Sequence, residues 1–220
     1  MAVAKEEKAR VRRIIRLLRE HYPRSRTALE FRSPLELLVA TILAAQCTDE
    51  RVNRITPVLF KRYPGAAELA AAERSELEDI IRPTGFFRNK AKSIMDAARK
   101  IVDDFGGKVP DTMEELIQLP GVARKTANIV LAAAFKKAEG IAVDTHVRRL
   151  AGRLGFSKND DPEKIESDLM ELVPREDWLD FNFMLVDHGR AVCQARKPDC
   201  PGCFLSRLCP SAGKFERGEK

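Results

Sequence analysis

LPGVARKTA, at residues 119–127, is the stretch that decides how the centre of this 220-residue chain folds. Pro120 cannot donate a helical hydrogen bond, and Gly121 permits the tight or left-handed backbone of a sharp turn. Apolar residues at helical spacing flank the turn, so the stretch predicts two helices joined by a hairpin. The first N–H groups of the second helix lack partners within that helix and can hold a phosphate. An ordinary corner also uses Pro-Gly, but Arg124 and Lys125 directly after it favour the phosphate site.

Helical signals recur along the rest of the chain. Ser33-Pro34 followed by Glu36 is a capping box with proline at the first helical position, and Asp161-Pro162 opens a further helix. Residues 178–192 are apolar on most faces, which predicts a buried helix. No run of alternating polar and apolar residues is convincing. The sequence therefore predicts an all-α protein of about ten short helices without a long linker.

Charge is concentrated at the two ends of the chain. Residues 1–26 hold nine Lys or Arg and three Glu, and the whole chain carries a formal charge of +6. Such a basic protein suits a polyanionic partner, although a solvated surface remains an alternative. The longest apolar stretch, residues 37–45, is far shorter than the ~18 residues that a membrane span needs. No secretory signal is visible, so we expect a cytoplasmic protein with no membrane contact.

Four cysteines lie close together near the end of the sequence. Cys193, Cys200, Cys203 and Cys209 follow the spacing C-x6-C-x2-C-x5-C. In a chain without a secretory signal this spacing indicates metal binding rather than disulfides, with either zinc or a 4Fe–4S cluster. Arg196 and Lys197 lie in the first loop of this cysteine cluster, where they could contact phosphate. Cys47 stands alone in an apolar run and is expected to be an inert core residue.

Lys125 and Asp144 are the candidate catalytic pair. Lys125 falls in the first turn of its predicted helix, where a cation is disfavoured, and this favours a neutral, nucleophilic amine. Asp144 directly precedes another predicted helix and is a typical N-cap. A capping carboxylate stays ionised and fixed, so it can also serve catalysis. Taken singly, a solvated lysine and a simple cap are equally acceptable interpretations.

The hairpin, the VDTH stretch at residues 143–146, the HGR stretch at residues 188–190 and the cysteine spacing together resemble the endonuclease III family of helix-hairpin-helix DNA glycosylases. The resemblance runs from about residue 29 to residue 209. It implies an all-α fold of two lobes: a six-helix lobe over residues 27–137, and a second lobe made of residues 1–26 and 138–220. The second lobe would carry a 4Fe–4S cluster on the four cysteines, and DNA would lie in the groove between the lobes.

The resemblance also implies a reaction. The protein would act as a monomer in a prokaryotic cytoplasm, with the nucleoid, and would remove oxidised pyrimidines from duplex DNA that carries damaged bases or abasic sites. Lys125 would attack the sugar C1′ to form a Schiff base, and β-elimination would then cut the strand. Asp144 would help to activate the lysine and stabilise positive charge on the sugar.

The same resemblance assigns DNA contacts. Gln46 would fill the space left by the flipped base, and Phe86, Phe87 and Arg88 would form a wedge loop. Gly121, Val122, Ala123 and Arg124 would hold a phosphate. The family often has Leu at the position of Phe86 and Gly at the position of Ala123, so the wedge differs in shape here.

Three alternatives can be weighed against the sequence. A monofunctional mismatch glycosylase shares the hairpin and the cysteines, but it generally lacks the hairpin lysine and has a catalytic Glu just before the gap-filling Gln. Residues 39–46 contain no carboxylate, which disfavours it. A non-catalytic DNA-binding module with a structural metal would bind DNA with a steep salt dependence and release no base. A soluble iron–sulfur electron carrier would leave the hairpin and the pair of Lys125 and Asp144 unused.

Overall fold

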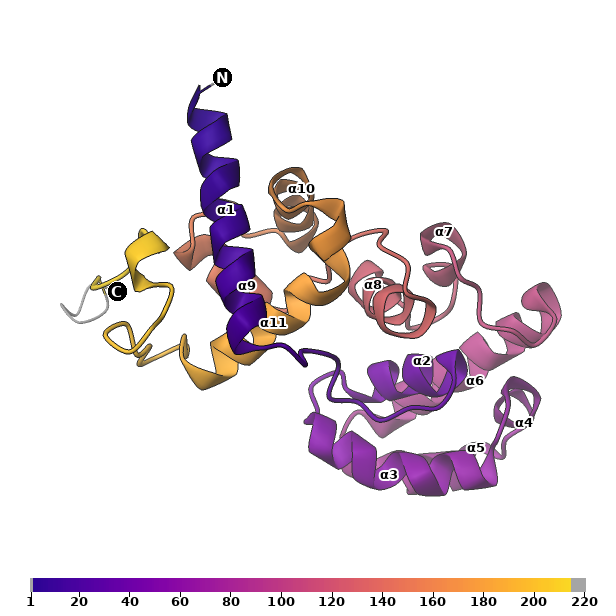
Figure 1. The fold of residues 1–220 in the computed structure, drawn as a ribbon. Coiled ribbons are helices and arrows are strands. Elements are labelled where there is room, and N and C mark those ends of the chain that lie inside the picture. Colours follow the sequence, from indigo (N-terminus) through magenta and orange to yellow (C-terminus); the bar gives the residue numbers. More distant parts are fainter. Residues whose placement is uncertain (1, 215–220) are drawn as a thin grey trace. The chain divides into compact units, whose positions relative to one another are not determined.

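The computed structural model describes residues 2–214, and these residues form helices, turns and loops without a strand (Figure 1). The predicted all-α class is therefore confirmed. Contacts between Cα atoms divide the chain into two compact units. One unit joins Met1–Arg26 to Ala138–Lys220, and the other is Thr27–Lys137. No helix among the described residues is both long enough and apolar enough to cross a bilayer.

The unit Thr27–Lys137 is built around a buried central helix. Its elements are α2 (Pro34–Leu43), α3 (Asp49–Arg62), α4 (Ala66–Ala70), α5 (Arg74–Ile81), η1 (Arg82–Thr84), α6 (Phe87–Phe105), α7 (Met113–Leu116), α8 (Arg124–Val130) and η2 (Leu131–Phe135). Every residue of α2 from 37 to 43 is buried. This helix contacts α3, α6 and α8, so it forms the centre of the unit's core.

Local sequence signals set the ends of these helices. Ser33 caps α2 by accepting a hydrogen bond from the Glu36 N–H, as the sequence predicts. Glu36 does not close the reciprocal half of a capping box, because its carboxylate accepts the N–H of Arg32 instead. Thr112 caps α7 by accepting the N–H of Glu115 and donating to its carboxylate. The helix before the hairpin is therefore fixed at its start.

Helix α8 continues into a single π-helical turn, η2. Lys136 ends this turn in the left-handed conformation, with a φ of 56°. The next residue, Lys137, donates from its ammonium to the carbonyl of Asp111 at 2.8 Å and lies 2.7 Å from the Asp111 carboxylate. The end of the unit is thus tied back to the segment that precedes α7.

The second unit packs four helices around one apolar core. Its elements are α1 (Ala2–His21), α9 (Thr145–Arg153), α10 (Pro162–Leu172), η3 (Arg175–Asp177), α11 (Trp178–Ala191) and η4 (Ser206–Leu208). Ile14 and Leu18 of α1, Leu150 of α9 and Phe181 of α11 are each 0% exposed in this core. Residues 181–185 of α11 are all buried, which confirms the predicted buried helix.

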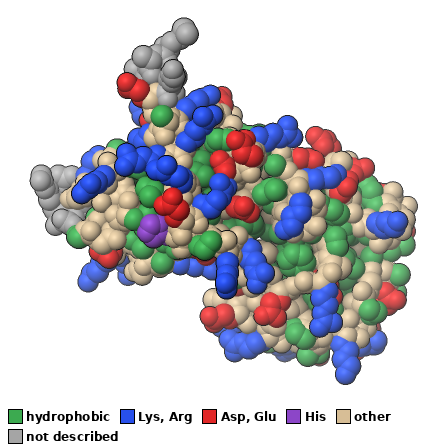
Figure 2. Space-filling view, viewed as in Figure 1, with side chains coloured by type: hydrophobic (Ala, Val, Ile, Leu, Met, Phe, Trp, Pro, Cys, Tyr) green, Lys and Arg blue, Asp and Glu red, His purple; other side chains and the backbone are tan. Residues whose placement is uncertain are grey.

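Helix α1 has two contrasting faces. Its buried residues recur at the spacing of one helical stripe and enter the core. Arg12, Arg13, Arg16 and Arg19 are exposed on the remainder of the helix. Figure 2 shows Lys and Arg side chains gathered along this segment. The basic character of the chain's beginning is therefore presented to solvent rather than neutralised in the core.

Candidate active site and cysteine loop

The hairpin between α7 and α8 packs tightly on α6. Gly121 has a φ of 79°, in the region that favours glycine. A Cβ at this position would lie only 2.6 Å from the Cβ of Ser93 on α6. Val122 turns its side chain into the core, with 6% exposed, and its N–H donates to the carbonyl of Leu119. Any contact of Val122 with DNA is therefore limited to its backbone.

Lys125 lies on the solvent-exposed side of this hairpin. It is the second residue of α8 and is exposed. Ala123 is the extended N-cap and provides no side-chain cap for the helix. The helix dipole and the amide groups of the first turn therefore face outward beside Lys125, with Arg124 half-buried next to it. This arrangement favours an anionic ligand at the lysine.

Asp144 caps the start of α9 in the other unit. Its Oδ1 atom accepts the N–H groups of His146 and Val147, each at 2.8 Å. Its Oδ2 atom lies 3.3 Å from Nδ1 of His146. The carboxylate is therefore held by the backbone through one oxygen, while the second oxygen faces an imidazole. The side chain is 24% exposed, so it remains accessible.

Close packing between α9 and α11 holds His146 and explains the HGR stretch. A Cβ at Gly189 would lie 3.2 Å from Cδ2 of His146 and 2.9 Å from a guanidinium nitrogen of Arg149. A side chain at Gly189 would push these groups away from α11. The glycine thus lets α11 pack against the part of α9 that follows Asp144.

The two predicted gap loops have unusual backbones. Gln46 and Phe86 adopt φ angles of 54° and 48°, and both are exposed. Phe86 exposes 64% of its surface, an unusual value for a phenylalanine. Phe87 is half-buried, and the exposed Arg88 places its guanidinium carbon 5.7 Å from the centre of the Phe87 ring. The prediction that Cys47 is a core residue is wrong, because it lies half-buried in the Gln46 loop, at the surface end of α2.

The four clustered cysteines line one pocket as free thiols. Burial raises the pKa of the Cys203 and Cys209 thiols. His188 also lines the pocket, and its Nε2 atom lies 3.5 Å from Sγ of Cys203. Burial lowers the pKa of His188 to about 4, so its ring is neutral at pH 7. Among the described residues, no group of three or more His, Cys, Asp or Glu side chains is arranged around a single metal ion.

Two arginines on α9 contact the start of the cysteine loop, the segment from Cys193 to Cys209. The sequence analysis missed this role. Arg153 donates to the carbonyls of Gln194 and Ala195, each at 2.8 Å, and to Sγ of Cys193 at 3.2 Å. Arg149 donates to the carbonyl of Cys193 at 3.2 Å. Their spacing of four residues places them on one face of α9, which was the signal available in the sequence.

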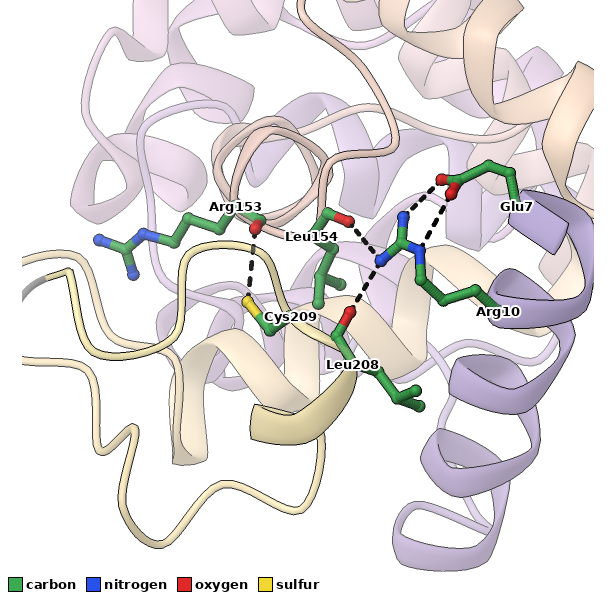
Figure 3. A network of polar contacts seen from close by, with 6 residues as sticks. All are labelled: Glu7, Arg10, Arg153, Leu154, Leu208 and Cys209. Carbon is green, nitrogen blue, oxygen red and sulfur yellow. Dashed lines mark hydrogen bonds and ion pairs between the residues drawn. The ribbon is translucent and has the colours of Figure 1, made fainter. Parts of the chain in front are cut away.

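Helix α1 holds the other end of the cysteine loop (Figure 3). Arg10 donates to the carbonyls of Leu154 and Leu208, at 2.9 and 2.8 Å. The Cys209 thiol donates to the carbonyl of Arg153 at 3.3 Å. Glu7 pairs with Arg10, and this guanidinium lowers the pKa of the Glu7 carboxyl. The last cysteine is therefore positioned by α1 and α9 together.

Arg196 and Lys197 are exposed on the loop between Cys193 and Cys200. The Asp199 N–H donates to the carbonyl of Val192 at 3.0 Å, which closes the base of this loop. Both cations therefore point from a short, closed loop beside the cysteine pocket. The unit Thr27–Lys137 contains Lys125, the hairpin and both gap loops, whereas Asp144, the cysteines and these two cations belong to the other unit.

Comparisons with known proteins support one family. Residues 39–175 match the HhH-GPD superfamily of base excision DNA repair proteins. The chain is 57% identical over 206 residues to endonuclease III of Synechocystis sp., and the match covers 94% of each chain. The chain belongs to the endonuclease III family. Members of this family are DNA glycosylases and AP lyases of base-excision repair, and this is the activity of the protein.

Solved structures agree with this assignment. A trapped endonuclease III–DNA covalent intermediate is 40% identical, with a TM-score of 0.90 over 96% of this chain and 99% of that chain. A thermostable thymine-DNA glycosylase is 26% identical, with a TM-score of 0.84 over 97% of this chain and 98% of that one. The non-catalytic binding module and the electron carrier are therefore set aside as functions for this member of the endonuclease III family.

The contact between Gly121 and Ser93 can be tested by a double-mutant cycle. We expect Gly121→Ala to lower the free energy of unfolding by roughly 2 kcal/mol, because the new methyl group meets Ser93 and the positive φ is strained. In a Ser93→Gly background the same substitution should cost roughly 1 kcal/mol, the part due to φ alone. Urea unfolding of the four proteins measures both values. Equal losses in the two backgrounds would show that Ser93 does not restrict position 121.

Proposed function

We propose that Lys125 is the nucleophile of this DNA glycosylase and AP lyase, and that oxidised pyrimidines in duplex DNA are its substrates. The observation that carries the proposal is the exposed amine of Lys125 in the first turn of α8, directly after the hairpin. A related endonuclease III has been trapped as a covalent intermediate with DNA, which supports a nucleophilic side chain in this fold. The choice of oxidised pyrimidines as the lesion is part of the same proposal.

The reaction has two stages, base release and strand cleavage. The neutral amine of Lys125 attacks C1′ of the sugar, the bond from C1′ to the base breaks, and the base leaves with its electron pair and gains a proton. The amine loses a proton, and the sugar ring opens to give a Schiff base. A proton then leaves C2′, the bond from C3′ to its phosphate oxygen breaks, and the strand is cut. Water finally releases Lys125.

Asp144 is proposed to stabilise positive charge on the sugar and to take up the proton that the amine loses. Its geometry suits this task because Oδ1 is held by two backbone N–H groups. The group therefore needs no rearrangement as charge develops, which is how a fixed carboxylate contributes to catalysis. His146 contacts the second oxygen and limits its rotation.

The DNA contacts are proposed in two groups. Backbone amides of Gly121 and Ala123, with the side chains of Arg124, Arg196 and Lys197, hold phosphates without reading sequence. Val122 supports this site indirectly, because its N–H already donates to the carbonyl of Leu119 and its side chain is buried. The exposed side chains of Gln46, Phe86 and Arg88, with the half-buried Phe87, act at the base stack instead. An apolar ring as exposed as Phe86 can unstack a base step, and Gln46 can occupy the space vacated by a flipped base.

A 4Fe–4S cluster is proposed on Cys193, Cys200, Cys203 and Cys209. The fit rests on three observations: the four thiols line one pocket, Arg153 donates to Cys193, and Arg149 lies beside the same loop. Nearby guanidinium groups stabilise thiolates. When bound, the cluster would crosslink the loop and thereby fix Arg196 and Lys197. Zinc is the alternative, and the single C-x2-C pair favours the iron cluster.

The remaining partners follow from the proposed reaction. Duplex DNA is the partner, in line with structures of endonuclease III relatives bound to DNA. Curated relatives come from bacteria, which supports a cytoplasmic protein associated with the nucleoid. We further propose that it works as a monomer.

Borohydride trapping tests the nucleophile. We expect the wild-type protein to form a covalent adduct with duplex DNA that carries one thymine glycol, because borohydride reduces the Schiff base. Lys125→Ala should form no adduct yet still bind the damaged duplex, because only the attacking amine is removed. Lys108→Ala, at another exposed lysine of the same unit, should trap like the wild type. An adduct with Lys125→Ala would reject the assignment.

Substitution of the two capping aspartates separates catalysis from helix stability. Asp144→Asn keeps an oxygen for the N–H groups of α9, so we expect the melting temperature to stay near the wild-type value. Base release in a single turnover should fall about a hundredfold or more, because the charge is lost. Asp161→Asn is the matched control, since Asp161 caps α10 in the same way. An unchanged release rate for Asp144→Asn would contradict the catalytic role.

Metal analysis tests the cluster. The purified protein should contain about four iron and four sulfide ions per chain and absorb visible light. Cys200→Ser should lower the iron content and the visible absorption, whereas Cys47→Ser should change neither, because Cys47 lies in the other unit. One zinc ion per chain, with no iron, would identify a zinc site instead.

A further inference from the structure

Lys90 is a buried lysine that no step of the proposed reaction uses. It lies in the first turn of α6 and is 5% exposed. Its ammonium donates to the carbonyl of Leu43 and to the carbonyl of Thr84, each at 2.8 Å. Leu43 is the last residue of α2, and Thr84 is the last residue of η1. One side chain therefore joins the ends of two elements that are far apart in the sequence.

Burying this ammonium is costly. Desolvation lowers the pKa of Lys90, and the nearby Cys47 opposes that change. A methionine of similar length would fill the same space without the desolvation cost. The two carbonyls that the ammonium holds offset this cost through hydrogen bonds. The role of Lys90 therefore depends on the two loops that follow these carbonyls.

Each of these two carbonyls lies just before a loop that contains a residue in the left-handed conformation, Gln46 in one and Phe86 in the other. Gln46 follows Leu43 by three positions, and Phe86 follows Thr84 by two. Among the described residues, the non-glycine residues with positive φ are Gln46, Phe86 and Lys136. Such backbone states persist only where surrounding structure enforces them. Two of the three thus lie on the loops that Lys90 ties, and both carry exposed side chains.

Further contacts hold the segment that precedes Phe86. The Thr84 hydroxyl donates to the carbonyl of Ile81 at 2.8 Å, and Thr84 is 1% exposed. Arg51, near the start of α3, lies within 3.5 Å of the carbonyl of Pro83. Thr84 is therefore held at a buried position just before Phe86. Lys90 links this position to the end of α2, after which Gln46 follows.

We propose that Lys90 is a positioning residue that locks the Gln46 loop and the Phe86 loop together, so that the two side chains act on the base stack as one unit. The inference rests on the proposed function, which assigns both side chains to the gap left by the flipped base. Neither loop can shift against the other without breaking a hydrogen bond to a buried ammonium. Lys90 itself touches neither the DNA nor the reacting atoms.

A set of double-mutant cycles tests this coupling. Gln46→Ala and Phe86→Ala are made singly and together, in the wild type and in Lys90→Met. The readouts are the single-turnover rate of thymine glycol excision and the fluorescence of 2-aminopurine placed next to the lesion. Residues that act as a unit are non-additive, whereas independent residues are additive. We expect non-additive effects with Lys90 present and additive effects in Lys90→Met.

Lys90→Met alone should slow excision and unstacking about tenfold or more, because small misplacements of positioning groups have effects of that size. Lys90→Arg should restore part of both rates, since it keeps a cation with several donors. Lys92→Met is the matched control on an exposed position of α6 and should leave both rates unchanged. Thermal melting identifies any variant that is not folded, and Lys90→Gln replaces Lys90→Met in the cycle if that protein does not fold.

Two results would overturn the inference: the same coupling between positions 46 and 86 with and without Lys90, or a wild-type excision rate in the Lys90 variants. The proposed function is judged separately by borohydride trapping on a duplex with a preformed abasic site. Trapping by the wild type together with unchanged coupling rejects the role of Lys90 alone. Failure of the wild type to trap rejects the nucleophile, whatever the cycles show.

Discussion

The packing of the hairpin on α6 is the contact on which the unit Thr27–Lys137 depends. Gly121 leaves room for Ser93, and this lets the turn before Lys125 lie directly against the helix. Lys90 lies one turn before Ser93 on the same helix and holds the ends of α2 and η1. Phe86 is the N-cap of that helix. The first turns of α6 thus gather the hairpin and both exposed loops at one end of the unit.

Helix α9 has a comparable role in the other unit. Its first residues hold the Asp144 carboxylate, and its last turns carry Arg149 and Arg153, which hold the cysteine loop. Gly189 lets α11 approach this helix closely. A displacement of α9 would therefore affect the carboxylate and the cysteine pocket together. This shared support would couple the proposed metal centre to the proposed role of Asp144.

The folded chain gives up stability at the positions that are proposed to contact DNA. Two left-handed residues, an exposed phenylalanine and a buried ammonium each raise the free energy of the folded chain. Gln46 and Phe86 lie on the loops that follow α2 and η1, and Lys90 lies in the first turn of α6. The surrounding core supplies the compensation, since α2 is buried along most of its length. Strain and exposure at a rigid site are expected where side chains must enter a stacked duplex.

The sequence by itself determined the helical class, the hairpin, the caps at Ser33 and Asp161, and the residue types of the candidate site. These features depend on neighbours within a few positions, where the chemistry of Pro, Gly, Asp and Ser acts directly. The tertiary structure alone decided the roles of Lys90, Arg10, Arg153 and Gly189, because each acts on a partner many residues away. Nothing in the local sequence separates Lys90 from the solvated lysines, and Cys47 is predicted there to be a core residue. Only the folded chain buries the lysine and leaves the cysteine half-buried, because burial is set by which distant segments pack together.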